Sequence, residues 1–206
     1  MKKPLLILPA FLLLILFILF TLVVRNQSLN IFDFNATVKL QDHIPLKYDE
    51  FFSSLSLIGS IEVLGILLLI IAIFQKKIKS FFIFIPFAGA HLIEIVGKSF
   101  LNHPGPPFMF FRYNLEFLFP SAYINTTSSY PSGHSLRIVF LSVIIFYLVK
   151  KSKLKSVNKL IFYLINILIT GSMLVSRVSL GEHWTTDVIG GTLLGLSSGL
   201  FAIIFL

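Results

Sequence analysis

Six long apolar runs, separated by short polar stretches, constrain what this chain can fold into more than any other feature of its sequence. A helix of about 20 mostly apolar residues is needed to cross about 30 Å of hydrocarbon. Hydrophobic residues make up 56% of the 206 residues and charged residues only 13%, which leaves too little polar surface for an ordinary soluble domain. We therefore expect an all-α, polytopic membrane bundle of six transmembrane helices, at residues 4–24, 52–74, 81–101, 132–149, 160–178 and 187–206.

The chain shows no internal repeat or low-complexity linker, so we expect residues 1–206 to form a single membrane-embedded domain. Its first run, 4–24, lies where a signal peptide would lie, but it is longer than an ordinary signal-peptide core and no small-residue cleavage site follows it. We interpret it as a retained anchor helix. The chain has no cysteine, which excludes disulfides, thiolate metal sites and a cysteine nucleophile.

Lysines form three clusters between the apolar runs, and none of the clusters contains an acidic residue. The clusters are Lys2 and Lys3; Lys76, Lys77 and Lys79; and Lys150, Lys151, Lys153, Lys155 and Lys159. Such clusters mark cytoplasmic loops and contact anionic lipid headgroups, so the net charge of +8 predicts a membrane partner and no nucleic acid. Both termini are then cytoplasmic, and the segments 25–51, 102–131 and 179–186 lie on the outer face.

Five ionisable residues fall at the outer ends of the predicted helices: Lys98, His134, Arg177, His183 and Asp187. Ionisable groups beside membrane helices are costly, so a set of them at one depth predicts a functional site. A channel or transporter is disfavoured, because transporter sites tend to lie near the midplane instead of at one surface. We expect the site to be built from the segments 98–134 and 176–187.

His183 and Asp187 are four residues apart, so the carboxylate can accept a hydrogen bond from one imidazole nitrogen. The other nitrogen is then free to act as a nucleophile or base. Arg177 supplies a planar fork of donors and Lys98 a point charge, a combination that suits phosphoryl oxygens.

The stretch Pro131, Ser132, Gly133, His134 predicts a tight turn at the start of the fourth helix. Helix N-termini bind anions through their free backbone amides. His134 is placed there to give a proton to a leaving oxygen.

These two blocks resemble the signature of the type 2 phosphatidic acid phosphatase superfamily, the integral-membrane lipid phosphate phosphatases related to vanadium haloperoxidases. That family carries Lys-x6-Arg-Pro, Pro-Ser-Gly-His and Ser-Arg-x5-His-x3-Asp. The second motif is complete here at 131–134, and the third is complete as Ser176, Arg177, His183 and Asp187.

The resemblance implies a role for each of these residues. His183 would attack phosphorus and form a phosphohistidine, Asp187 would orient it, and His134 would protonate the leaving group. The oxygens of the phosphoryl group would be held by Ser132, the Gly133 amide, Lys98 and Arg177. It implies no metal and no cofactor.

The first motif departs from the family pattern, because Gly105 stands where the family has arginine. Loss of a charged clamp on a transition state costs on the order of 10²–10³ in rate. His103, Arg112 or Arg137 could replace the missing charge, with Arg112 favoured, or the glycine could make room for a bulkier head group such as a diphosphate.

Glu94 lies four residues before Lys98, and His91 lies on the same helix face. Glu94 would hold Lys98 toward the site, or the two would form a buried structural ion pair.

We expect a phosphatase that acts on a lipid phosphate or diphosphate at the outer membrane face. By resemblance the candidate substrates are undecaprenyl diphosphate, phosphatidic acid and phosphatidylglycerol phosphate, and the other partners are membrane lipids. The alternatives are a lipid-linked phosphotransferase and, because of Gly105, a catalytically silent lipid-binding relative. The sequence does not choose among the lipids and says nothing of the oligomeric state.

Overall fold

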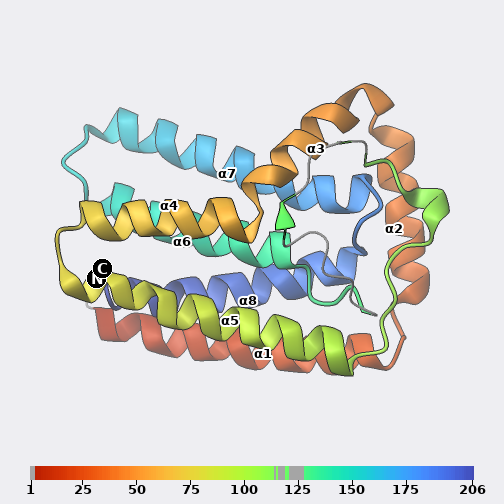
Figure 1. Ribbon diagram of the computed structural model, residues 1–206, viewed down its shortest axis with the longest axis horizontal. Helices are drawn as coiled ribbons and strands as arrows, with labels where there is room; N and C mark the ends of the chain where they lie inside the picture. Colours follow the sequence, from red (N-terminus) through yellow and green to blue (C-terminus); the bar gives the residue numbers. More distant parts are fainter. Residues whose placement is uncertain (1–2, 114, 116–118, 121–127) are drawn as a thin grey trace.

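The computed structural model of the protein describes residues 3–113, 115, 119–120 and 128–206, which fold into a bundle of helices (Figure 1). Within these ranges no residue lies in a β-strand, so the all-α prediction is confirmed. The α-helices are α1 (Ile7–Arg25), α2 (Asn30–His43), α3 (Asp49–Ile58), α4 (Ile61–Phe74), α5 (Phe84–Phe100), α6 (Gly133–Lys151), α7 (Ser156–Ser179) and α8 (Thr185–Ile203). Short 3-10 helices are η1 (Lys3–Leu6), η2 (Leu46–Tyr48), η3 (Ile78–Ile83) and η4 (Phe108–Phe110). The predicted active-site segment 98–134 is described except at residues 114, 116–118 and 121–127.

Five segments of the described chain are long and apolar enough to cross a membrane: α1, the η3–α5 unit (Ile78–Phe100), α6, α7 and α8. The remaining predicted span, 52–74, is not one straight helix. Its two halves meet at 52° between Ile58 and Ile61. The break begins a new helix because Ser60 leaves the helical conformation and its hydroxyl accepts a hydrogen bond from Val63 N at 3.2 Å. Counted as one span, the bent pair brings the total to six.

The last helix, α8, is the centre of the bundle and packs against α6, α1 and α5 (Figure 1). Its approach to α6 is close because glycines face that helix. A Cβ at Gly191 would overlap the carbonyl oxygen of Ser132, and a Cβ at Gly195 would lie 2.5 Å from the carbonyl oxygen of Leu136. Small residues at a membrane helix interface allow this backbone contact. Helices α6 and α8, whose first turns carry residues of the second and third motifs, are therefore in direct backbone contact.

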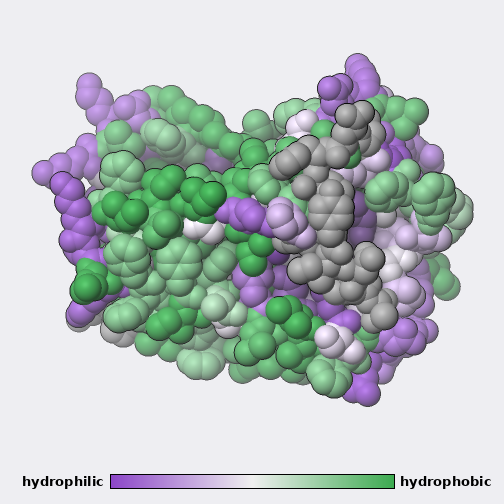
Figure 2. Space-filling view, viewed as in Figure 1, coloured by the Kyte–Doolittle hydropathy of each residue, from purple (hydrophilic) through white to green (hydrophobic). Residues whose placement is uncertain are grey.

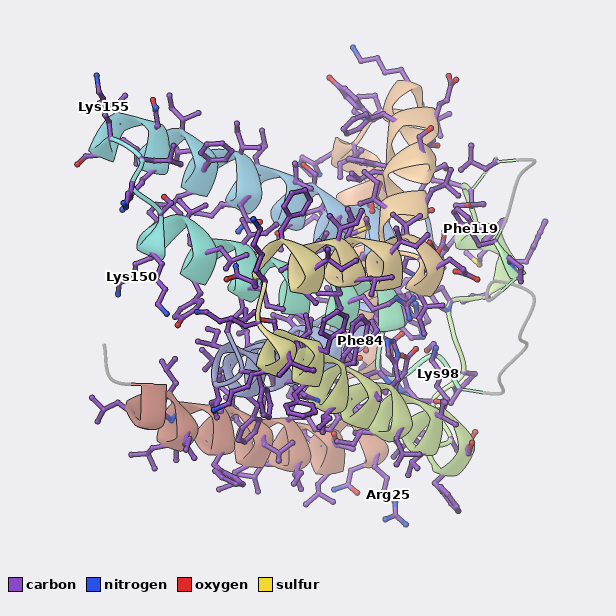
Figure 3. The ribbon with its side chains drawn as sticks, turned by 60° about the vertical axis from the view of Figure 1, so that its left-hand side comes forward. Arg25, Phe84, Lys98, Phe119, Lys150 and Lys155 are labelled. Carbon is purple, nitrogen blue, oxygen red and sulfur yellow. The ribbon has the colours of Figure 1, made fainter. Side chains whose placement is uncertain are left out.

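The two ends of the bundle differ in what they contain (Figure 1). Both termini lie at one end, together with the α4–α5 and α6–α7 connections that carry two of the lysine clusters. Lys150 and Lys155 are at this end and Lys98 is at the other (Figure 3). Hydrophilic residues gather toward the two ends, and a hydrophobic band lies between them on the face shown in Figure 2. This distribution matches a protein that spans a membrane.

The end opposite the termini is covered by a helix that the sequence did not predict. The expected outer segment 25–51 contains α2, which lies across the ends of the bundle helices (Figure 1). Two polar side chains of α2, Asp33 and Thr37, are almost completely buried. One of them, Asp33, turns out to contact the start of α8.

Candidate active site

The Pro-Ser-Gly-His stretch forms the predicted turn at the start of α6. Ser132 is the N-cap residue, and its hydroxyl accepts hydrogen bonds from Ser135 N at 3.4 Å and Ser135 Oγ at 3.1 Å. Its own backbone N–H donates to the carbonyl oxygen of Asp187 at 3.0 Å. The start of α6 is thus joined directly to the first turn of α8, where the third motif ends.

The pair formed by His183 and Asp187 is present as predicted. His183 Nδ1 lies 3.3 Å from Asp187 Oδ2, and the same oxygen accepts from the backbone N–H of Trp184 at 2.9 Å. This second bond caps the N-terminus of α8 and fixes the carboxylate. Because Nδ1 faces the carboxylate, Nε2 is the imidazole nitrogen that points away from it and is available to a substrate.

Arg177 is completely buried at the end of α7, and its backbone holds the loop that follows. Its carbonyl oxygen accepts from Glu182 N and His183 N, both at 3.1 Å. Its Nε and Nη2 donate to Ser176 Oγ at 3.2 and 3.1 Å. Its Nη1 donates to Glu182 Oε2 at 2.7 Å. The guanidinium predicted to hold phosphate is therefore paired with a carboxylate in this structure.

Sequence reasoning did not identify Glu182 as part of the site. Its other oxygen, Oε1, is buried and has no hydrogen-bond partner among the described residues. The available signal was its place immediately before His183, five residues after Arg177, on a loop too short to carry the side chain far away.

The carboxylate of Glu94 contacts basic side chains from both α5 and α6. Its Oε1 accepts from Lys98 Nζ at 2.8 Å, and its Oε2 lies 2.9 Å from His91 Nδ1 and 3.6 Å from Arg137 Nη1. Arg137 Nε also donates to the carbonyl oxygen of Gly59 at 2.7 Å, at the break between α3 and α4. The predicted contact of Glu94 with Lys98 is confirmed, and Arg137 belongs to the same cluster.

This cluster lies against the start of α6. A Cβ at Gly133 would overlap Glu94 Oε1, so only glycine allows the carboxylate this close to the turn. On the neighbouring residue, the imidazole of His134 packs on Gly59, where a Cβ would lie 2.8 Å from His134 Cδ2. Lys98, His134 and the turn therefore lie together at the end of the bundle opposite the termini.

Of the candidates to replace the missing arginine, Arg112 is held elsewhere. Its Nε donates to Asp49 Oδ2 at 3.0 Å, and its terminal nitrogens donate to the carbonyl oxygens of Gln41 and Ile44 at 3.3 and 3.1 Å. The structure thus joins Arg112 to the region between α2 and α3 and does not bring its guanidinium to the motif residues. At Gly105 itself, a Cβ would face Ser129 Cβ at 3.5 Å and the carbonyl oxygen of Glu182 at 4.0 Å.

His103 approaches the other oxygen of the third-motif carboxylate, with its Nε2 3.3 Å from Asp187 Oδ1. Behind it, Asp33 accepts from Thr186 N at 2.9 Å and from Thr186 Oγ1 at 2.6 Å. Burial lowers the pKa of His103, but its contact with Asp187 and the charges of Asp187 and Asp33 outweigh burial and raise that pKa overall. Burial is also the main reason that the pKa of Asp33 is raised.

A cavity of about 570 Å³ opens beside His103, with walls from the α1–α2 connection, α2, the segment after α5 and the start of α8. It is lined by Gln27, Asn30, Asp33, Phe34, Asn102, His103, Pro104, Gly105, Pro107 and Trp184. No set of three or more histidine and carboxylate side chains within the described ranges is close enough to hold a metal ion.

Comparison with known proteins places this geometry in a family. The model of the PAP2 superfamily matches residues 63–206, which contain the complete second and third motifs. The chain belongs to the PAP2 superfamily. A crystal structure described as the first transmembrane PAP2 type phosphatidylglycerolphosphate phosphatase from Bacillus subtilis superposes with a TM-score of 0.76 at 24% identity, covering 95% of this chain and 94% of that one. The crystal structure of Aquifex aeolicus LpxE gives a TM-score of 0.63 at 23% identity, over 84% of this chain and 95% of that one.

Among curated proteins, phosphatidylglycerophosphatase B of Bacillus subtilis (strain 168) is 44% identical over 69 residues. The aligned part spans about a third of each protein, 33% of this chain and 34% of the relative. The family match confirms the family expected from the motifs, and the two superpositions confirm the membrane fold.

Proposed function

We propose that this chain is an integral-membrane phosphatase that hydrolyses a lipid phosphate or diphosphate through a phosphohistidine on His183. The observation that carries the proposal is the pairing of His183 Nδ1 with Asp187 Oδ2 at 3.3 Å. His183 is also joined to the buried Arg177, whose carbonyl oxygen accepts from His183 N at 3.1 Å. This arrangement provides an oriented nucleophile and a cation for the anionic substrate.

In the first step, His183 Nε2 forms a bond to phosphorus as the bond from phosphorus to the leaving oxygen breaks. His134 gives its proton to that oxygen, and Asp187 stabilises the positive charge that develops on the His183 ring. Arg177, Lys98, the Ser132 hydroxyl and the Gly133 amide hold the non-reacting oxygens. In the second step, water gives a proton to His134 and its oxygen bonds to phosphorus as the bond from phosphorus to His183 Nε2 breaks, which releases phosphate and the neutral imidazole.

Both cations proposed to hold the phosphate are paired with carboxylates in the structure, because Glu94 binds Lys98 and Glu182 binds Arg177. Substrate phosphate must therefore share or displace these partners. The same observation, with the glycine at position 105, supports the second candidate, a catalytically silent lipid-binding relative.

The substrate class that we favour testing first is phosphatidylglycerol phosphate, because the curated relative is a phosphatidylglycerophosphatase. Phosphatidic acid and undecaprenyl diphosphate are the other two candidates. Transfer of the phosphoryl group from His183 to a second lipid instead of water is the enzymatic alternative, and it would make product formation depend on an acceptor.

For the orientation, we place both termini in the cytoplasm and the candidate active site at the outer face. The termini and the lysine-rich connections share one end of the bundle, which agrees with the positive-inside rule (Figure 1). Reporter fusions after Lys79 and Lys155 should report a cytoplasmic location and a fusion within 102–131 an outer one. The opposite pattern would invert the assignment.

The deciding experiment measures phosphate release by detergent-purified protein from the three lipids in EDTA, with His183→Ala in parallel. The matched control is His43→Ala, because His43 is an exposed histidine on α2. Release that is lost with His183→Ala and kept with His43→Ala supports a histidine phosphatase. Absence of release by every form, also in the presence of acceptor lipids, would favour the silent relative, and Gly105→Arg would then test whether the missing arginine is the cause.

A further inference from the structure

The third-motif carboxylate lies between two histidines, of which the family motif contains only one. Asp187 Oδ2 contacts His183 Nδ1 and accepts a hydrogen bond from the backbone N–H of Trp184, as described above. The nearest basic group to its second oxygen is His103, whose Nε2 lies 3.3 Å away. This separation is an ion-pair contact instead of a well-aligned hydrogen bond, and Oδ1 has no hydrogen-bond partner among the described residues. Since Asp187 is completely buried, the charge of that oxygen requires compensation.

Several contacts hold His103 in a position where it can compensate the charge of Asp187 Oδ1. Its carbonyl oxygen accepts from Ser129 N at 2.9 Å, from Ser129 Oγ at 3.1 Å and from Ser128 Oγ at 3.2 Å. Its ring packs edge-on against Tyr130, with the ring centroids 6.2 Å apart. Only 5% of the residue is exposed. Its backbone is thus fixed to the segment that leads into the Pro-Ser-Gly-His turn.

The hydrogen-bond chain to Asp33 shows which nitrogen of His103 carries a proton. Thr186 Oγ1 has one hydrogen, and it donates that hydrogen to Asp33 Oδ2 at 2.6 Å. The 3.4 Å contact between Thr186 Oγ1 and His103 Nε2 therefore requires Nε2 to be the donor. The same Nε2–H faces Asp187 Oδ1.

The titratable groups around His103 favour its charged form. Asp187 faces it from α8 and Asp33 from α2. Tyr130 contacts it from the segment before α6, and the Tyr130 hydroxyl is hydrogen-bonded to Thr21 Oγ1 of α1 at 2.9 Å. Two carboxylates and a neutral phenol thus surround the imidazole.

We propose that His103 is a positioning residue: as an imidazolium it binds Asp187 Oδ1 and so holds the carboxylate that orients His183, while Asp33 supplies a second negative charge behind it. This inference rests on the proposed phosphatase function for its kinetic consequence, but the ion pair itself does not depend on it. His103 acts through Asp187 and does not replace the missing arginine as a phosphate ligand. Its loss should therefore lower kcat, whereas loss of a phosphate ligand that binds ground and transition states alike would raise KM.

The kinetic test compares His103→Gln with His43→Gln, which changes an exposed histidine on the same side of the bundle. We expect kcat to fall about 10- to 100-fold in His103→Gln, the scale of a misplaced reacting group, with KM within about twofold and no change in His43→Gln. A raised KM with unchanged kcat would overturn the proposal and return His103 to the role of phosphate ligand.

The pH profile gives a second readout. The pKa of His103 is raised, so the imidazolium is present at low pH and is lost as the pH rises through that pKa. The wild-type protein should therefore lose kcat on the alkaline side, Asp33→Asn should move that loss to lower pH, and His103→Gln should abolish it. An alkaline limb that is the same in all three proteins would refute the proposal.

A measurement without substrate separates this inference from the proposed function. NMR of ¹⁵N-histidine-labelled protein in detergent should show the His103 ring losing its proton above pH about 6.5, the ordinary histidine value, and at a lower pH in Asp33→Asn. If His103 titrates at or below the ordinary value, the ion pair is absent. If the wild-type protein releases no phosphate from any lipid, the phosphatase assignment fails while this titration still decides the pair.

Discussion

Asp187→Asn is the substitution that tests the catalytic geometry most directly, because it removes charge and keeps shape. In the wild-type structure Trp184 N lies 2.9 Å from Asp187 Oδ2. The amide oxygen of asparagine can take the place of Oδ2 and still accept this hydrogen bond, so the cap of α8 is kept. The amide nitrogen then faces His103. What is lost is the negative charge beside the His183 ring.

The magnitude follows from the 3.3 Å between His183 Nδ1 and Asp187 Oδ2. Two unit charges at this separation interact by about 5 kcal/mol at an effective dielectric of about 20. Because the charges are spread over the ring and the carboxylate, their centres lie farther apart, and about 4 kcal/mol is the better figure. This charge interaction is made only when the His183 ring becomes positive in the transition state. At about 1.36 kcal/mol for each factor of ten, kcat should fall about 10³-fold.

The assay is the single-turnover formation of trapped phosphohistidine together with steady-state phosphate release. Asp49→Asn is the matched control, because Asp49 is a buried carboxylate whose ion pair with Arg112 lies outside the site. It should alter thermal stability and leave kcat near the wild-type value. If folded Asp187→Asn keeps kcat within tenfold of the wild type, the reasoning that Asp187 stabilises a charged His183 is wrong.

Three further experiments probe the rest of the site and its scaffold. Arg112→Ala should lower the melting temperature and leave turnover unchanged, whereas Arg177→Ala should abolish turnover; loss of turnover in Arg112→Ala would restore the idea that it compensates for the missing arginine. Glu182→Gln removes the negative charge that is paired with Arg177 and should lower KM roughly 5-fold, equivalent to about 1 kcal/mol. An unchanged KM would mean that the carboxylate does not compete with phosphate. Gly191→Val should destabilise the protein by about 1–3 kcal/mol through overpacking against the turn at the start of α6. Gly65→Val is the control, because a Cβ there meets no atom of another element within 4 Å. An equal loss of unfolding free energy in the two variants would contradict this.

Much of the fold could be predicted because the information is local. Apolar runs of about 20 residues require membrane helices whatever their neighbours are, and the predicted spans agree with the observed helices except at Gly59 and Ser60. The break there could not be predicted from hydropathy, since residues 52–74 form one apolar run that is long enough to cross a membrane. Only the Ser60 cap, which is set by backbone conformation, shows where the second half begins.

The helix α2 was missed for a related reason. Its sequence mixes polar and apolar residues without a clear apolar face, so periodicity gave no signal. Its significance lies in Asp33, which contacts Thr186 across 153 residues of sequence. No pattern along the chain connects these two positions.

The sequence was sufficient to show that this chain crosses a membrane and to predict two local pairs. Glu94 and Lys98 are one turn apart on α5, so helix geometry brings them together. His183 lies four residues before Asp187, just ahead of α8, so only a short stretch of chain separates its ring from the carboxylate in the first turn of that helix. The tertiary structure alone decided that His103 faces Asp187 instead of a phosphate position, and that Arg112 is joined to Asp49. These contacts depend on how separate helices and loops pack, because a side chain's partner across a bundle is chosen by burial and charge compensation in three dimensions.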